Sequence, residues 1–348
     1  MLTYMHRAAL CSVGLSLMAC GDPVTEPETT GSAVASSPLL SAAVPGIWRK
    51  MPQILPARSN MSAAVLAKSV VVVGGSSRQQ PAGMRRVDAY NVETRTWTPL
   101  APLPEPRLRH GATTINGKIY VAGGVGPPVN AGDLQPKKSL FVYDPATNAW
   151  GRKADMPAPV YTALQANLSG RLYVYALGND FTPDYFLAYS PGADTWVRLP
   201  LPPSRHFGGV MTALDGKLYL TDGLTRAQVN PYNLQLDVYD PRTRSWTVRS
   251  PMLLYGGNAG TVAGVLHGKL WVAGTPSEFV TDSTGSHYLS NRGVQVYDPV
   301  TDEWKYGPLM LRNSRNGAAA VAGGKLYVIG GTDFGERTGV VQALSTSY

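Results

Sequence analysis

Tryptophan recurs along this chain at a nearly constant interval. Six of the seven tryptophans are separated by 49, 53, 46, 50 and 58 residues. They are Trp48, Trp97, Trp150, Trp196, Trp246 and Trp304. A period near fifty residues, sustained over most of a 348-residue chain, indicates a repeat architecture in which each unit buries its apolar face against its neighbours. This period constrains the fold more than any other property of the sequence.

A short segment with a tyrosine precedes five of the six tryptophans. Each copy alternates like a strand and ends in Asp, Asn or Ser, in most repeats followed by proline. Asp and Asn side chains can cap a turn, and proline fixes φ there. We therefore interpret Asp144, Asp240 and Asp298 as turn caps rather than catalytic carboxylates, and we expect the tryptophan to open the next strand.

A second segment occurs earlier in each repeat, clearest at residues 116–124 and 324–331. It consists of a turn, a strand of alternating apolar residues and then glycine. The glycine is doubled in three repeats and reduced to Leu-Gly, Asp-Gly or Ala-Gly in the other three. Glycine permits backbone conformations and close approaches that a β-carbon forbids, so we expect neighbouring chain segments to pack tightly there.

Double glycine, then tyrosine, then tryptophan at this spacing resembles the kelch repeat, over residues 47–348. The resemblance implies an all-β fold, a six-bladed kelch-type β-propeller. The last repeat lacks its tryptophan strand, whereas residues 46–51 supply an unmatched one around Trp48. We therefore predict that this N-terminal strand completes the last blade, which closes the ring and removes an exposed sheet edge. A β-sandwich, the alternative for glycine-rich strands, does not require a sixfold repeat.

The first twenty residues resemble an export signal. Residues 1–19 combine Arg7 with an apolar stretch too short to span a bilayer. The stretch ends in Leu-Met-Ala before Cys20, which resembles a bacterial lipobox and implies lipid attachment to Cys20. Residues 20–46, rich in Pro, Ser, Thr and Ala, are then a flexible tether. The implied location is the bacterial cell envelope, either the outer membrane, which Gly21 favours, or a periplasm-facing membrane leaflet. The alternative is an ordinary secretory signal with a chance cysteine.

The sequence contains no recognisable cofactor or metal motif. Cys11 and Cys20 are the only cysteines, so the folded body has no thiol, and the copper site of galactose-oxidase-like propellers is excluded. The histidines show no metal-ligand spacing. We therefore expect no metal and no cofactor, and we nominate no catalytic residue. The formal net charge is +8, but Lys and Arg form no run, which disfavours nucleic acid as a partner.

Candidate binding residues follow from the repeat register. We count back ten residues from the turn glycine of each repeat, or from Lys68 in the first repeat, to a position near the channel entrance of kelch propellers. The six repeats have there Arg58, Arg107, Val160, His206, Asn258 and Ser314. Two residues further on, on the same side by strand alternation, they have Asn60, Arg109, Thr162, Gly208, Gly260 and Asn316. A slip of one residue in the last repeat would bring in Arg315. The predicted binding rim is Arg58, Arg107, Arg109, His110, His206, Asn258 and Arg315.

Convergent arginines bind carboxylate or phosphate, so we expect an anionic ligand at this rim. The alternative is that these side chains satisfy strand-end carbonyls and channel waters. The long loops within the repeats, of which residues 275–292 form the longest, are a second candidate surface.

The expected function is that of a monomeric binding scaffold for a protein or an anionic glycan. The alternative is a sugar-processing enzyme similar to N-acetylneuraminate epimerase, a mutarotase, to which Arg58, Arg107 and His206 would contribute.

Overall fold

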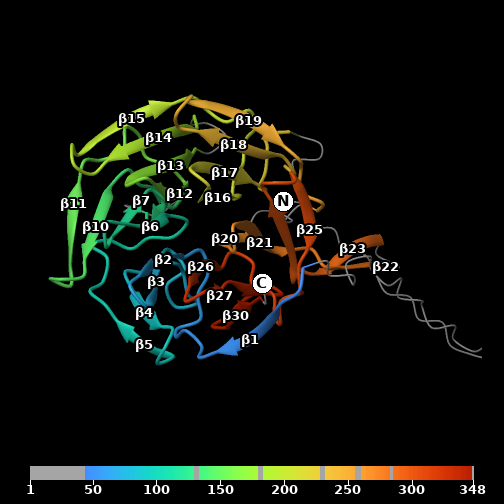
Figure 1. The fold of residues 1–348 in the computed structure, drawn as a ribbon. Coiled ribbons are helices and arrows are strands. Elements are labelled where there is room, and N and C mark those ends of the chain that lie inside the picture. Colours follow the sequence, from blue (N-terminus) through green and yellow to red (C-terminus); the bar gives the residue numbers. More distant parts are fainter. Residues whose placement is uncertain are drawn as a thin grey trace, which may run out of the picture. The chain divides into compact units, whose positions relative to one another are not determined.

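The computed structural model describes residues 44–128, 133–178, 183–227, 232–254, 260–282 and 285–346. All of them belong to one compact unit, residues 36–348. Their strands form six four-stranded antiparallel sheets, which stand around a central axis as the blades of a propeller (Figure 1). The predicted all-β, six-bladed architecture is therefore confirmed. Within the described ranges, no helix has the length and apolar character needed to cross a bilayer.

In each blade the first strand lies nearest the axis, and the first strands of neighbouring blades contact one another. Blade 1 contains β2 (Ser62–Leu66), β3 (Ser69–Val73), β4 (Val87–Asn91) and β5 (Thr96–Pro99). Blade 2 contains β6 (Gly111–Ile115), β7 (Lys118–Ala122), β10 (Leu140–Asp144) and β11 (Ala149–Lys153). Blade 3 contains β12 (Thr162–Leu168), β13 (Arg171–Leu177), β14 (Tyr185–Ser190) and β15 (Thr195–Leu199).

The other three blades repeat this arrangement. Blade 4 contains β16 (Val210–Leu214), β17 (Lys217–Thr221), β18 (Leu236–Asp240) and β19 (Ser245–Arg249). Blade 5 contains β20 (Val262–Leu266), β21 (Lys269–Thr275), β24 (Gly293–Asp298) and β25 (Glu303–Tyr306). Blade 6 contains β26 (Ala318–Ala322), β27 (Lys325–Ile329), β30 (Val341–Ser345) and β1 (Ile47–Met51).

Three small hairpins extend loops between second and third strands. They are β8 (Val125–Gly126) with β9 (Gln135–Pro136), β22 (Glu278–Asp282) with β23 (Gly285–Ser290), and β28 (Thr332–Asp333) with β29 (Glu336–Arg337). The longest of the expected loops, residues 275–292, therefore contains a hairpin.

The N-terminal strand closes the ring as predicted. β1 pairs antiparallel with β30 over five residue pairs, from Ile47 opposite Ser345 to Met51 opposite Val341. The sheet of blade 6 is thus built from both ends of the propeller. Because β1 occupies the outer edge of this sheet, the third strand of blade 6 has hydrogen-bonding partners on both sides.

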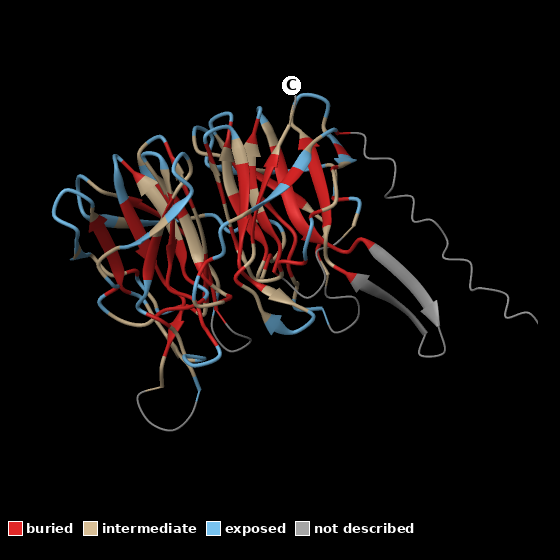
Figure 2. Cartoon of the chain, turned by 90° about the horizontal axis from the view of Figure 1, so that it is seen from below, coloured by how far each residue is buried: buried red, intermediate tan, exposed pale blue. Residues whose placement is uncertain are grey.

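The alternating strand directions give the ring two different faces. Tight turns join the first to the second strand and the third to the fourth, and we term their side the hairpin face. The loops between second and third strands, and those from blade to blade, lie on the opposite side, the loop face. β1 begins and β30 ends at the hairpin face, because Ile47 is paired with Ser345. Figure 2 shows exposed turns at both faces and buried strands between them.

The six recurring tryptophans link neighbouring blades. Each indole N–H donates to a carbonyl in the loop that leaves the preceding blade, at 2.8–3.0 Å. In five blades the tryptophan also packs on the tyrosine of the third strand, with ring centroids 5.0–5.2 Å apart. The turn-cap interpretation is confirmed too, since Asp144, Asp240 and Asp298 each accept a backbone N–H two residues further on.

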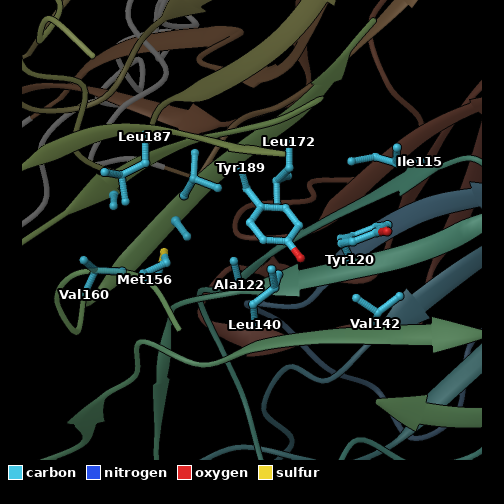
Figure 3. Close-up of a cluster of buried hydrophobic side chains, with 13 residues drawn as sticks. Ile115, Tyr120, Ala122, Leu140, Val142, Met156, Val160, Leu172, Leu187 and Tyr189 are labelled. Carbon is cyan, nitrogen blue, oxygen red and sulfur yellow. The ribbon is translucent and has the colours of Figure 1, made fainter. Parts of the chain in front are cut away.

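The hydrophobic core lies in layers between successive blades. Figure 3 shows the layer in which Tyr120 and Leu140 of blade 2 lie near Leu172 and Tyr189 of blade 3. The ring centroids of Tyr120 and Tyr189 are 6.2 Å apart. Burying one large apolar side chain contributes about 1.5–3 kcal/mol. Such layers therefore hold the blades together side by side and leave the axis free for a channel.

Candidate functional site

The channel along the propeller axis opens on the loop face into a cavity of about 420 Å³, which we term the mouth. All six blades line it, mainly through the residues that lead into their first strands. Two further cavities, of about 160 and 370 Å³, follow along the first strands toward the hairpin face. The mouth is therefore the loop-face end of an axial channel, where loops from every blade converge.

Left-handed backbone shapes the mouth in five of the six blades. The angle φ is 56° at Asn60, 58° at Arg109, 72° at Gly208, 133° at Gly260 and 56° at Asn316. Backbone hydrogen bonds of 2.7–2.9 Å run from blade to blade through these positions: Asn316 donates to Gly260, Asn60 to Asn316, and Arg109 to Asn60. This belt of hydrogen bonds fixes the backbone from which the side chains at the mouth project.

The structure places the predicted rim residues in two environments. Arg109 is exposed and Arg315 is half-buried, and both line the mouth, while His110 lines both the mouth and the next cavity along the channel. Arg58, Arg107 and His206, in contrast, are 0% exposed. Asn258, like Cys20, lies outside the described residues. Ligand binding by any of these residues stays a prediction.

The two buried arginines anchor the loops that lead into their blades. Arg58 Nη2 lies 2.6 Å from the Asp88 carboxylate. Arg107 Nη1 donates to the carbonyl of Gly123 at 2.8 Å, and Nη2 forms an ion pair with Glu105. Arg107 thus satisfies the carbonyl at the end of a strand, as the alternative interpretation of the rim expects.

His206 has the same kind of role in blade 4. Its Nε2 lies 2.9 Å from the Asp237 carboxylate and its Nδ1 lies 2.9 Å from the carbonyl of Asp222. The Ser204 hydroxyl also lies 3.1 Å from Nε2, and the Asn233 side-chain nitrogen lies 3.1 Å from Nδ1. Burial raises the pKa of Asp237, but hydrogen bonds from His206 and Gln235 outweigh burial and hold that pKa below its usual range. His206 and Asp237 thus form a buried polar pair inside the blade.

The expected strand alternation does not hold at the rim. Residues two apart share a side only while the backbone stays extended, and Asn60 and Arg109 are left-handed. The chain therefore turns between Arg58 and Asn60, and again between Arg107 and Arg109. As a result, the earlier side chain of each pair is buried in its blade and the later one reaches the mouth.

Sequence reasoning missed the third-strand residues that hold these loops. Asp88, Asp237 and Gln295 each stand two residues before the shared tyrosine, and Gln342 stands two before its replacement, Leu344. All four are buried. The Gln295 side-chain oxygen accepts two loop N–H groups at 2.8 and 3.1 Å, and that of Gln342 accepts two at 2.9 and 3.3 Å. The available signal was a polar residue at one repeated position of an otherwise apolar strand.

His110 is a buried imidazole at the base of the mouth. It is 4% exposed, and neither ring nitrogen makes a hydrogen bond of normal geometry. Burial, assisted by the positive charge of Arg107 and opposed by the nearby backbone of Val73, lowers the pKa of His110 to about 3. The ring is therefore neutral near pH 7 and offers one donor and one acceptor.

Other parts of the described surface have fewer features of a ligand or metal site. A hollow of about 950 Å³ lies between residues 77–87 and 99–106. Its two arginines are engaged within the protein, Arg85 with the carbonyl of Leu103 and Arg86 with Asp88. Within the part of the chain that the structure describes, no group of three or more His, Cys, Asp or Glu residues could hold a metal ion.

Known proteins share the repeats. The Kelch motif matches residues 57–104, 106–157 and 314–347. Beta-scruin of Limulus polyphemus is 23% identical over 308 residues, which cover 85% of this chain and 33% of that protein. Kelch-like protein 36 of Bos taurus is 26% identical over 265 residues, which cover 75% of this chain and 42% of that protein. The chain thus spans well under half the length of these curated relatives.

A solved structure supports the architecture. The protein titled "Structure of YjhT" matches with a TM-score of 0.70 at 18% identity, over 84% of this chain and 95% of that one. At this identity the match speaks for the fold alone. The six four-stranded blades and their closure by β1 show a six-bladed β-propeller, and the matched Kelch motifs show that it contains kelch repeats.

Proposed function

We propose that this propeller is a binding scaffold whose mouth holds an anionic group of a protein or glycan ligand. The observation that carries the proposal is the charge of the mouth: Arg109 and Arg315 line it, and none of its described lining residues is acidic. Arginine donates paired N–H groups to carboxylates, and Asn60 and Asn316 add amide groups beside it. The volume, about 420 Å³, lies within the range of small-molecule sites.

Titration calorimetry with glucuronate, an acidic peptide and neutral glucose tests this proposal. We expect the anions to bind in preference to glucose, and Arg109→Asn to weaken anion binding about tenfold. Asparagine tolerates the left-handed backbone but lacks the guanidinium. Arg95→Asn is the matched control, because Arg95 is also exposed with φ 59° but lies in a turn of the hairpin face. Failure of wild-type protein to bind either anion would reject the proposal.

We also propose that a lipid on Cys20 anchors the scaffold in the bacterial cell envelope, with residues 1–19 as the signal and residues 20–46 as the tether. The lipobox-like residues before Cys20 support this assignment. Labelling of cells with radioactive palmitate should mark the wild type and Cys11→Ser but not Cys20→Ser. The latter should also leave the membrane fraction. Label retained by Cys20→Ser would contradict the anchor.

The mutarotase alternative loses the residues first assigned to it, because Arg58, Arg107 and His206 are buried with partners inside the protein. At the mouth it would depend on Arg109 and on His110, whose low pKa makes it a weak base. We expect no acceleration of sialic-acid anomer exchange by NMR. Acceleration that Arg109→Asn abolishes would establish the enzyme instead.

A further inference from the structure

The mouth has two chemically different halves. The cationic half comes from blades 6, 1 and 2. It contains Arg315, Asn316, Asn60 and Arg109 beside the buried Met61 and His110. The apolar half comes from blades 3 and 4. It contains Leu164, Phe207 and Leu224 beside the buried Thr162 and Ala163. Each half is continuous around the ring, because successive blades are neighbours. Gly260 and Thr261 of blade 5 lie between the two halves.

The apolar half is accessible and held in place. Leu164, Phe207 and Leu224 are each half-buried, so part of every side chain stays uncovered. The backbones of Phe207 and Leu224 exchange two hydrogen bonds of 2.9 and 3.0 Å. An uncovered apolar wall inside a cavity gains free energy when a ligand displaces its water. This wall therefore favours a ligand with an apolar part.

The charges near the apolar half are engaged within the protein. The Arg205 guanidinium lies over the Phe207 ring, 4.9 Å from its centroid, but its Nε is 2.8 Å from the Asp184 carboxylate. Asp222 is 1% exposed and accepts a hydrogen bond from Thr261 at 2.6 Å. Neither Arg205 nor Asp222 is among the residues that line the mouth, so the lining of the apolar half carries no charged side chain.

We propose that the mouth recognises a carboxylate joined directly to a carbon that bears an apolar side chain, an inference that rests on the anion-binding function above. The carboxylate lies on the cationic half and the apolar side chain covers Phe207 and Leu224. A singly charged carboxylate costs less than a doubly charged phosphate to place beside an apolar wall. This chemistry occurs in free small acids and at the C-terminus of a peptide that ends in an apolar residue.

Calorimetry with N-acetylleucine, its amide, N-acetylglycine and glucuronate tests the proposal. We expect N-acetylleucine to bind about tenfold more tightly than its amide, which lacks the charge, and several-fold more tightly than N-acetylglycine, which lacks the side chain. Arg109→Asn should reduce the preference for the acid over the amide. Phe207→Ala should reduce the preference for leucine over glycine, and Arg95→Asn should change neither. Leu224→Ala probes the same wall should Phe207→Ala unfold.

The outcomes separate this proposal from the function on which it rests. Equal binding of N-acetylleucine, N-acetylglycine and glucuronate would overturn the role of the apolar half and leave the anion site intact. Equal binding of N-acetylleucine and its amide would overturn the role of the carboxylate in this ligand, and no binding by any acid would overturn both proposals. A hexapeptide ending in leucine distinguishes the sources: tighter binding than N-acetylleucine supports a peptide C-terminus, and equal binding supports a free acid.

Discussion

Two glycines of blade 2 have left-handed backbone under different constraints. Gly124 has φ 81°, and a β-carbon there would lie 2.5 Å from the carbonyl oxygen of Leu108. Gly117 has φ 73° in the turn between β6 and β7, and a β-carbon there would meet nothing within 4 Å. The first glycine is required by packing as well as by conformation, and the second by conformation alone.

Alanine at these two positions should therefore have unequal costs. We expect Gly117→Ala to lower the free energy of unfolding by about 1 kcal/mol, the cost of a left-handed alanine. Gly124→Ala should lower it by about 2–4 kcal/mol, because the clash with backbone adds to that cost. Urea unfolding of both variants measures the difference. Equal costs would show that the backbone around Leu108 can yield.

The buried pair of His206 and Asp237 predicts a dependence of stability on pH. The pKa of Asp237 is lower in the folded protein than its ordinary value of about 3.9 in the unfolded chain. The ionised carboxylate therefore adds stability above about pH 4, and this stability is lost as the pH falls through the folded pKa. Asp237→Asn should cost about 3 kcal/mol at pH 7, and less as the pH falls below 4.

Urea unfolding at pH 7 and at pH 3.5 checks this expectation. Asp133→Asn serves as the control, because Asp133 is exposed, and it should match the wild type at both values. A cost of Asp237→Asn that is the same at both pH values would mean that Asp237 stabilises the loop by its shape and hydrogen bonds rather than by its charge.

At the scale of residues, the sequence predicted the turn caps but not the orientation of the rim. Asp144 needs only its own turn, so a local pattern identifies it. Arg58 and His206 are buried because they pair with Asp88 and Asp237 of the third strands. Such pairing between distant residues cannot be read from a local sequence pattern. Arginine is also an unusual left-handed residue, so nothing in the sequence marked Arg109 as the point where the chain turns.

The strands themselves were more predictable, because each depends on alternation that a short window contains. β1 is an informative example, since it lies far from its partner along the chain and was still assigned to the last blade. The evidence was a count of repeats: the last repeat lacked a tryptophan strand, and the tryptophan strand around Trp48 belonged to no other repeat. Trp48 then makes the same bond as its five counterparts, donating to the carbonyl of Pro308 at 2.9 Å.

Deletion of residues 47–51 should strongly destabilise the propeller. The deletion removes five backbone pairs with β30 and the bond from Trp48 to Pro308, and it leaves β30 as an exposed edge. We expect a lower thermal midpoint together with self-association, measured by calorimetry and size-exclusion chromatography. A variant whose chain begins at residue 45 keeps β1 and should behave as the wild type. Unchanged stability after the deletion of residues 47–51 would refute closure as a source of stability.

The whole molecule is a ring held together at two radii. Near the outside, the indole N–H groups bond each blade to its predecessor. Near the axis, the backbone belt connects Gly260, Asn316, Asn60 and Arg109. The outer links repeat with the sequence, so blade number and order could be predicted. The residues that line the mouth could not be predicted. Side chains such as Phe207 and Arg315 do not recur in the other repeats, and they come together only when the ring closes.

The pairing of Ile47 with Ser345 has a consequence for the order of the chain. Because these residues are neighbours in one sheet, a few residues could join them and the chain could be opened elsewhere by circular permutation. A permutant opened between Ala146 and Thr147, in an exposed turn of blade 2, keeps both new ends within one sheet. A permutant opened between Pro157 and Ala158 has its ends in different blades. We expect the first permutant to unfold at the higher temperature. The ring is stabilised when its first and last strands pair within one sheet, whichever blade contains the two chain ends.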